Sequence, residues 1–410
     1  MVRIVWPSTG GSGVRRVAGI AVVVGLGLVV FLASALALPG PRSFHFTGRE
    51  QSYVVPRGVT LVLVNALGAV GGPTVTIGQS GLSLTAYLPV TPGGVLFTEV
   101  GQPGSNQGGL GFGGGGAAGK DIHENIVDAG SGGGATDVRT CSEQAATCSG
   151  GGSSSSSRLI VAGGGGGSGG VGGGSGNLCG NSTGAGSAGA STGGGSQAGS
   201  TVRTAAGTVI VASHGQSAAP STPAGGGSQS AAGGGGRNAN CASGGNTLPG
   251  SAPGSAGNGP TGGAGANAVA TTGGGGGGGG GYFGGGGGAS GQQICNSAGC
   301  PGSGAGGGGG GGSSFVAARA VLAPGFGPSS APPSVTYTPQ VEVDVPAAHA
   351  TYKAGQVIAA RWSCVNTISC KGTVASGRPI ATTPGKHSFT VKAVVSGRTV
   401  RSTITYTVKR

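Results

Sequence analysis

Charged side chains are scarce in this sequence. They make up 8% of its 410 residues, and nine of them are acidic. Glycoside hydrolases need a pair of suitably spaced carboxylates, so few residues are candidates for such a site. The low charge also argues against simple disorder, which combines low hydrophobicity with high net charge. A glycan- or cell-wall-active hydrolase is therefore an alternative function and not the leading one.

Helical patterning is absent as well. After residue 38, no stretch longer than two helical turns repeats its apolar residues with the period of an amphipathic helix. Collagen is excluded because the abundant glycine does not follow a strict Gly-X-Y repeat. The sequence thus predicts an all-β protein.

Glycine is present in excess, with 102 residues. Gly273–Gly281 is an uninterrupted run of nine, and Gly306–Gly312 is a run of seven. Such runs are either flexible spacers or chains packed side by side. A chain without side chains can form an extended helix with three residues per turn, whose N–H and C=O groups bond to neighbouring chains. Cysteines and strand-like segments recur between the runs, which a linker does not need, so an ordered bundle is favoured.

The N-terminus has the features of an export signal. Arg15 and Arg16 precede an apolar run, and Ala35 and Ala37 supply the small residues of a signal-peptidase site. Cleavage is favoured, with residues 1–37 as a signal peptide. The uncharged stretch Val17–Leu38 is also long enough to span a bilayer, so an uncleaved single-pass N-terminal anchor is the alternative. Either way, the bulk of the chain is expected to be extracellular or on the cell surface.

An even number of cysteines follows the signal, which in an exported chain indicates disulfides. The eight are Cys141, Cys148, Cys179, Cys241, Cys295, Cys300, Cys364 and Cys370. Neighbours in the sequence suggest the pairs Cys141–Cys148, Cys295–Cys300 and Cys364–Cys370, which leaves Cys179 with Cys241. Zinc is disfavoured because the chain has no CxxC motif and no histidine at ligand spacing from a cysteine pair. No metal or cofactor is expected.

Strand-like segments alternate with glycine runs over residues 44–338. Val59–Leu67 is apolar and β-branched, Leu82–Val90 alternates with a period of two, and Gly94–Val100 follows a turn. Further short strands are predicted within Gly132–Thr140, Arg158–Gly167, Thr208–Ala212, Ser313–Ala317 and Val335–Tyr337.

Four segments occur in a characteristic order: Val55–Val59 (VPRGV), Gly132–Arg139 (GGGATDVR), Leu159–Gly163 (LIVAG), and polyglycine interrupted by Tyr282-Phe283. This order resembles the extracellular glycine-rich domain of the anaplastic lymphoma kinase and leukocyte tyrosine kinase receptors, a pattern shared by bacterial secreted proteins. The resemblance implies a jelly-roll sandwich similar to tumour necrosis factor, with bundled polyglycine helices inserted between its strands, over residues 44–338. It brings no kinase with it, because the chain lacks HRD, DFG and VAIK-type motifs.

Residues 339–410 are predicted to form a second, small β-sandwich. Apolar residues alternate with polar ones in Val341–Val345, Phe389–Val395 and Val400–Val408. Turns are expected at Pro384-Gly385 and Ser396-Gly397.

This C-terminal segment also resembles a known family. Gly355–Val357, Cys370–Val374 and His387–Val391 are similar to bacterial immunoglobulin-like repeats of cell-surface proteins, which implies an immunoglobulin-like domain. Cys364 and Cys370 are too close in the sequence to bridge two sheets, and are expected to close a local loop.

Some apparent catalytic motifs follow from composition alone. Gly114–Lys120 (GGGAAGK) approximates a phosphate-binding loop, but Asp121 stands where Ser or Thr should hold magnesium. Gly166–Gly170 matches the nucleophile-elbow pattern, yet Ser168 lacks the strand-to-helix setting.

Two small groups of charged residues are better explained by structure than by chemistry. The cluster of Asp121, His123, Glu124 and Asp128 is more typical of a solvated loop than of a calcium site. Asp137 and Arg139 flank Val138, and are expected to pair with each other or to fix a turn.

Basic residues are concentrated near the C-terminus. Residues 331–410 contain ten Lys and Arg against two acidic residues, whereas residues 38–330 contain nine against seven. Clustered basic charge attracts polyanions. The sequence therefore favours a non-enzymatic secreted or cell-surface structural or adhesive binding protein. Its expected partner is an extracellular ligand, such as an anionic surface polymer or a protein, and not a specific nucleic acid.

The remaining alternative is a ligand-sensing surface receptor without a kinase. The 16 residues before the apolar run are too few to form an intracellular effector, which disfavours this function.

Overall fold

The computed structural model describes residues 39–74, 78–106, 111–120, 129–145, 157–170, 201–211, 221–222, 224–228, 231, 233, 237–238, 252–269, 272–291, 293–296, 299–303 and 305–410. Within these residues the protein consists of strands and extended segments without an α-helix, so the predicted all-β class is confirmed. Accordingly, this part of the chain contains no helix long and apolar enough to cross a membrane. The predicted signal segment, with Ala35 and Ala37, lies outside it.

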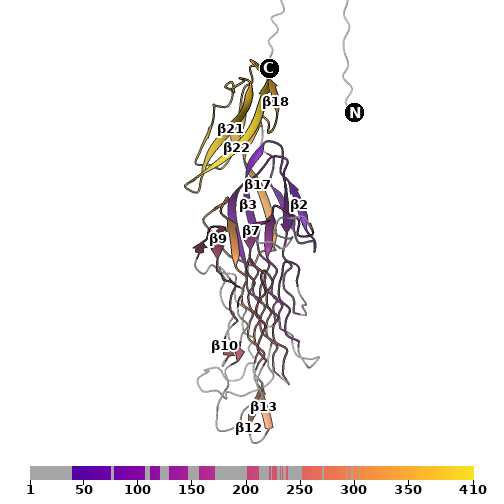
Figure 1. Cartoon of the computed structure of the whole chain (residues 1–410). Helices are drawn as coiled ribbons and strands as arrows, with labels where there is room; N and C mark the ends of the chain where they lie inside the picture. Colours follow the sequence, from indigo (N-terminus) through magenta and orange to yellow (C-terminus); the bar gives the residue numbers. More distant parts are fainter. Residues whose placement is uncertain are drawn as a thin grey trace, which may run out of the picture. The chain divides into compact units, whose positions relative to one another are not determined.

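Two seven-stranded sheets form the larger β-structure (Figure 1). Sheet A has the order β1 (Arg42–His45), β17 (Ser334–Val345), β3 (Val59–Leu67), β4 (Gly81–Pro89), β15 (Val321–Leu322), with β16 (Gly327–Ser329) also on β4 and β19 (Arg361–Cys364) also on β17. Sheet B has the order β2 (Gln51–Val54), β5 (Val95–Glu99), β6 (Thr136–Arg139), β7 (Arg158–Ala162), β14 (Ser314–Ala317), β9 (Gly207–Ile210), β8 (Thr201–Arg203).

Three smaller sheets complete the described structure. Sheet C contains β18 (Thr351–Lys353), β22 (Arg398–Lys409), β21 (Gly385–Val395) and β20 (Ser369–Gly372), in this order. The other two are two-stranded: β10 (Ser221–Thr222) with β11 (Arg237–Asn238), and β12 (Gln293–Asn296) with β13 (Gly299–Ser303).

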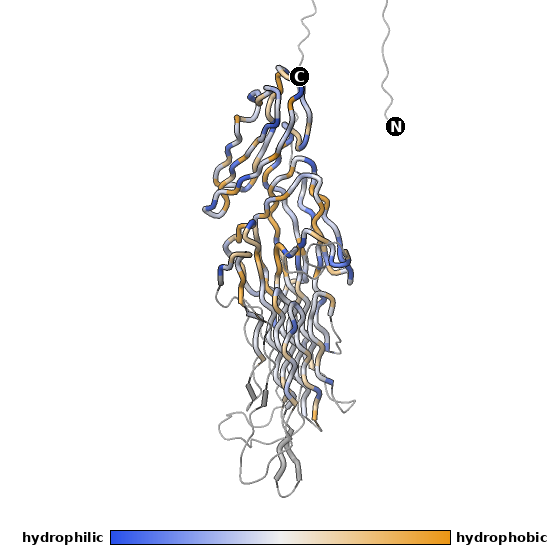
Figure 2. Tube along the Cα trace, viewed as in Figure 1, coloured by the Kyte–Doolittle hydropathy of each residue, from blue (hydrophilic) through white to orange (hydrophobic). Residues whose placement is uncertain are grey.

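Sheets A and B pack face to face around one apolar core. Alternate residues of β3, Val62 and Val64, meet Val138 of β6 and Ile160 of β7 there, and all four are fully buried. Apolar stretches stand out along the chain trace around β3 and β17 in Figure 2, whereas the glycine segments are pale. This sandwich follows from the period-two patterning of the strands. The jelly-roll order of connections stays a prediction.

The glycine runs form a hydrogen-bonded bundle. Each N–H from Gly275 to Gly280 donates to a neighbouring segment at 2.8–2.9 Å, and the acceptors in order are the carbonyls of Ala266, Gly307, Gly130, Gly263, Gly310 and Gly133. The carbonyls of the same six residues accept, in order, from the N–H groups of Gly119, Gly288, Gly167, Gly116, Gly285 and Gly164. Each neighbour thus recurs every third residue, the period expected of an extended chain with three residues per turn.

Six neighbouring segments therefore surround the run Gly273–Gly281, three accepting from it and three donating to it. This arrangement satisfies the backbone groups that a buried extended chain would otherwise leave unpaired. It also explains the composition. A Cβ on Gly278 would lie closer than 3.0 Å to the backbone of Gly285, and a Cβ on Gly277 would collide in the same way with Gly116.

Strand β17 belongs to two packing units. Its first part pairs with β3 through Tyr337 opposite Val64, and its last part pairs with β19 through Val343 opposite Trp362. The sequence predicted two strands here, Val335–Tyr337 and Val341–Val345, on either side of a domain boundary at 338/339. The structure joins them, because Pro339 is accommodated at a register shift opposite Val62 and does not end the ladder. The division into domains itself stays a prediction.

A second core lies between sheet C and β17. Phe389, Val391 and Ile404 of sheet C pack there with Val341 of β17 and Leu61 of β3, all at most 4% exposed. Leu61 belongs to the N-terminal part of the chain, so this core is built from both ends of the protein.

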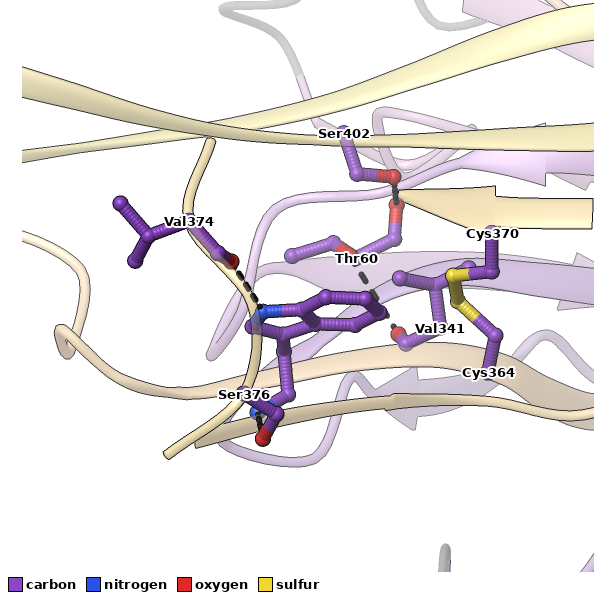
Figure 3. The surroundings of a disulfide bond; sticks show 8 residues. Thr60, Val341, Cys364, Cys370, Val374, Ser376 and Ser402 are labelled. Atoms are coloured by element: carbon purple, nitrogen blue, oxygen red, sulfur yellow. Dashed lines mark hydrogen bonds between the residues drawn. A yellow bond between two sulfur atoms is a disulfide. The ribbon is translucent and has the colours of Figure 1, made fainter. Parts of the chain in front are cut away.

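The predicted disulfide between Cys364 and Cys370 is present, and it joins the end of β19 to β20. Figure 3 shows it beside Val341, which pairs with Cys364 across β17 and β19. Cys141 is also disulfide-bonded. Its predicted partner Cys148 lies outside the described residues, as do Cys179 and Cys241, and the described side chains do not include those of Cys295 and Cys300.

Candidate functional site

A buried group of charged side chains lies on sheet B. Glu99 of β5 stands opposite Asp137 of β6, and Arg139 of β6 stands opposite Arg158 of β7. All four residues are at most 5% exposed. Burying four ionisable groups together costs desolvation free energy unless they form ion pairs. The contacts among them therefore show whether their role is structural.

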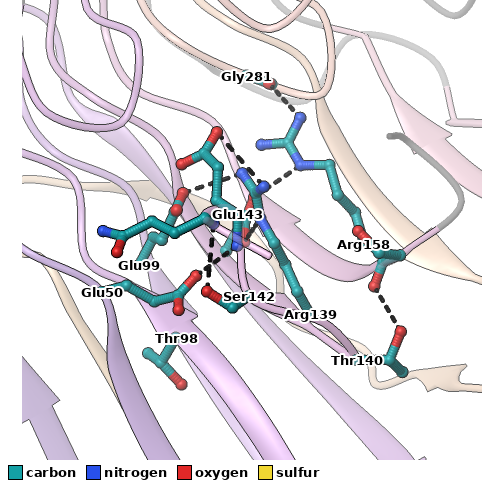
Figure 4. Close-up of polar contacts among 12 residues, drawn as sticks. Glu50, Thr98, Glu99, Arg139, Thr140, Ser142, Glu143, Arg158 and Gly281 are labelled. Atoms are coloured by element: carbon teal, nitrogen blue, oxygen red, sulfur yellow. Dashed lines mark hydrogen bonds and ion pairs between the residues drawn. The ribbon is translucent and has the colours of Figure 1, made fainter. Parts of the chain in front are cut away.

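Asp137 contacts both arginines of this cluster, and Figure 4 shows Glu99, Arg139 and Arg158 around it. Its two carboxylate oxygens accept from Arg139 Nε at 2.8 Å and from Arg158 Nε at 2.6 Å. Burial alone would raise the pKa of Asp137, but the two guanidinium groups outweigh burial and lower it. Asp137 and Arg139 therefore form the structural pair that their spacing on either side of Val138 predicted.

Glu99 has the opposite electrostatic setting. Arg139 Nη2 lies 2.9 Å from Glu99 Oε2, yet the pKa of Glu99 is raised to about 9, first by burial and then by the neighbouring carboxyl of Glu143 and the charge of Asp137. The Arg139 charge acts against this rise but is shared with Asp137. Oε1 of Glu99 has no hydrogen-bond partner within the described part of the chain, so burial favours the protonated, neutral carboxyl.

Arg158 connects this cluster to the polyglycine bundle. Its Nη1 donates to the carbonyl of Gly281 at 2.8 Å, at the end of the run Gly273–Gly281. The next residue, Tyr282, stacks on Phe315 of β14 with ring centroids 4.2 Å apart. The guanidinium of Arg158 also lies 6.0 Å from the centre of the Tyr282 ring. The cluster thus fixes the end of a glycine run against the outer face of sheet B, which is a structural task.

A hollow lies next to this contact. It has a volume of about 430 Å³ and is lined by Thr140, Arg158, Leu159, Ala206, Phe315, Ala317, Ala318 and Arg319. A smaller hollow of about 170 Å³ shares Thr140 and Arg319 with it. Arg319 makes no ion pair with any described residue, and partial burial lowers its pKa. The walls are mainly apolar with two cations, of which Arg158 is paired with Asp137, an environment that suits a small ligand more than a catalytic step.

Several residues singled out in the sequence are engaged in the bundle. Within Gly114–Lys120, Gly116 and Gly119 donate their N–H groups to Gly278 and Gly275, so these groups do not form a phosphate cradle. Ser168 is fully buried, and its backbone carbonyl accepts from Gly130. The cluster around His123 lies outside the described residues. Among those that are described, no three His, Cys, Asp or Glu side chains gather to hold a metal ion.

The sequence analysis did not single out Glu99 and Arg158 as partners of Asp137 and Arg139. It also did not single out Arg319, which lines the hollow. Only the register of β5, β6 and β7 brings Glu99 and Arg158 next to the pair Asp137 and Arg139. The signal available in the sequence was the presence of charged residues at the ends of strands that are otherwise apolar.

Comparison with known proteins gave no match, either among protein-family models or among curated proteins. The resemblance to the receptor glycine-rich domain and to immunoglobulin-like repeats therefore remains a prediction from the residues quoted above.

Proposed function

We propose that this chain is a non-enzymatic, exported structural or adhesive protein that binds an extracellular ligand. The observation that carries the proposal is that buried polar groups of the described residues bond to one another. Backbone N–H and C=O groups of the glycine runs bond to one another, and the buried carboxylate and guanidinium groups hold a glycine run against sheet B. In the described part of the protein, the backbone groups of the glycine runs and the buried charged cluster thus have a structural role.

Export is part of the same proposal. The Cys364–Cys370 disulfide supports an oxidising compartment, because disulfides persist outside the cytosol. In this proposal the N-terminal segment is either cleaved after Ala37 or retained as a membrane anchor, and the remainder is outside the cell or on its surface.

A binding-and-cleavage assay tests the proposal. The chain beginning at Leu38 is incubated with a panel of insoluble extracellular polymers that includes neutral glycans and anionic wall polymers. Co-sedimentation measures binding, and chromatography of the supernatant measures released fragments. We expect retention on at least one polymer without fragment release. Release of soluble fragments would favour the hydrolase, and retention on none of the polymers would contradict an adhesive function.

A further inference from the structure

The solvent-facing side of sheet C carries only cationic, hydroxyl and one aliphatic side chain. Register and strand alternation place these residues on it: Thr351, Lys353, Ser369, Lys371, Lys386, Ser388, Thr390, Lys392, Val394, Thr399, Arg401, Thr403, Thr405, Thr407 and Lys409. The alternate residues of the same strands, such as Phe389 and Ile404, face the core. These solvent-facing residues form the cationic face of sheet C.

Three cations of this face stand side by side across three strands. Lys371 of β20 is opposite Lys392 of β21, and Lys392 is opposite Arg401 of β22. Neighbouring strands lie about 4.8 Å apart, so the three side chains start within about 10 Å of one another. Like charges placed directly opposite one another destabilise a sheet. An anion lying across this row would remove that repulsion.

A second group of three cations lies at the other end of the face. Lys353 pairs with Lys409 across β18 and β22, and Lys386 stands opposite Thr407 of β22. Lys386 and Lys392 are six residues apart on β21, which corresponds to about 20 Å along an extended strand. The two cationic groups are thus separated by a fixed distance on a continuous sheet.

Hydroxyl groups fill the space between these two groups. Thr390 Oγ1 and Thr403 Oγ1 are 2.8 Å apart and hydrogen-bonded, and Ser388 stands opposite Thr405. Hydroxyls both donate and accept hydrogen bonds, as do the hydroxyls of sugars and polyols.

Within residues 345–410, no acidic residue neutralises the cationic face. All of residues 345–410 are described by the structure, and they contain ten Lys and Arg but no Asp or Glu. Within this described segment the only cation in an ion pair is Arg361, which contacts Asp344 of β17 and belongs to β19 and not to sheet C. The six cations of the face are all exposed.

We propose that the cationic face is a binding site for a linear anionic glycopolymer, that is, a sugar or polyol chain carrying phosphate or carboxylate groups. This inference rests on the proposed adhesive function and names its ligand class and its site. The two cationic groups hold anionic groups about 20 Å apart along the polymer, and the hydroxyl rows contact the sugar or polyol units between them. Proteins that bind single-stranded nucleic acids stack bases on aromatic side chains. The Phe and Tyr residues of sheet C are on its core side instead: Phe389 and Tyr406 are buried there, and Tyr352 is partly buried against them. This favours a glycopolymer over a nucleic acid.

The test compares two variants with the same change in charge, both made in the chain beginning at Leu38. The face variant is Lys371→Gln/Lys392→Gln/Arg401→Gln. The control variant is Arg378→Gln/Arg398→Gln/Arg410→Gln, which removes three exposed cations outside the cationic face. Poly(glycerol phosphate) is the probe, and binding is measured at low and at physiological salt. Neutral dextran and a single-stranded oligodeoxynucleotide of equal charge are comparison ligands, and thermal unfolding verifies that both variants are folded.

We expect the face variant to bind poly(glycerol phosphate) at least tenfold more weakly than wild type, with a smaller salt dependence, and the control variant to bind within about twofold. Equal weakening in both variants would assign binding to net charge alone and overturn the site. Equal or tighter binding of the oligodeoxynucleotide would overturn the ligand class. If wild type binds dextran but not the polyanion, the cationic face fails as a site while the adhesive function stands.

Discussion

A Cβ atom on Gly278 would occupy the space of a neighbouring backbone. It would collide with the carbonyl of Gly285, and a Cβ on Gly279 would collide with that of Gly164. Because the obstacles are hydrogen-bonded main chains and not flexible side chains, they have little room to move. The absence of a side chain is therefore the packing requirement of the bundle, and the entropy that glycine loses on folding is offset by backbone hydrogen bonds on every side.

The first prediction follows from this packing. We expect Gly278→Ala to lower the free energy of unfolding by about 3 kcal/mol or more, the upper range for inserting a methyl group into a packed interior. Gly327→Ala is the matched control, because a Cβ there has no atom within 4 Å. Chemical denaturation measures both. Equal stability of the two variants would contradict a packed bundle.

Glu99 gives a prediction about pH. Its pKa is raised to about 9 in the folded protein, so between pH 5 and 9 the folded state keeps a proton that the unfolded state has lost. Stability contributed by this group is complete below the unfolded pKa near 4.5 and is lost as the pH rises towards 9. The lowered pKa of Asp137 acts in the opposite direction, but only in more acidic solution.

We therefore expect Glu99→Gln, which is neutral at every pH, to become more stable relative to wild type as the pH rises from 5 to 9, by up to roughly 1.4 kcal/mol per pH unit. Denaturation of both proteins across this range measures the difference. Parallel pH profiles would mean that Glu99 is ionised in the folded state.

Strand β17 is the element that joins the two apolar cores. Val341 stands opposite Leu61 of β3 and opposite Cys364 of β19, and is fully buried. Because β17 pairs with both β3 and β19, the unfolding of either partner strand would destabilise the pairing of β17 with the other. The β-structure on either side of position 338/339 is thus expected to unfold together, although its cores are distinct.

The chain beginning at Leu38 contains a single tryptophan, Trp362, which reports on the second core. We expect its fluorescence and the far-ultraviolet circular dichroism to give coincident unfolding transitions. Val341→Ala, which removes two buried methyl groups, should lower both midpoints together, at a cost of roughly 2 kcal/mol. Two separated transitions would show that the units on either side of β17 unfold independently.

Period-two patterning was sufficient to predict the strands that lie in the cores. Val59–Leu67 has the predicted bounds, and the strands predicted around Leu82–Val90 and Gly94–Val100 begin or end within one residue of them. Patterning was insufficient for β17, because Val335–Tyr337 and Val341–Val345 were predicted as two strands although a register shift at Pro339 joins them in one. Lateral register is a tertiary property. The row of Lys371, Lys392 and Arg401, spread over 31 positions of the sequence, could not be predicted without it.

For the molecule as a whole, the sequence predicted a bundle of glycine runs but not which segments are hydrogen-bonded to one another within it. Each donor of Gly275–Gly280 finds its acceptor in a segment far along the chain or in a neighbouring run, such as Gly130, Gly263 or Gly307. Runs of identical residues carry no local signal for register. The register of the bundle is fixed instead by residues that are not glycine, among them Arg158, which holds Gly281, and Tyr282, which stacks on Phe315.

Amide hydrogen exchange in the chain beginning at Leu38 tests the ordered bundle most directly. An isolated glycine run is a random coil whose amides exchange freely, whereas amides that open only with the whole structure are protected to the level of its global stability. We expect the amides of Gly275–Gly280 to be protected to the same degree as those of the core strand β3. Exchange of these amides at the rate of an unstructured Gly-Ser peptide would contradict the bundle.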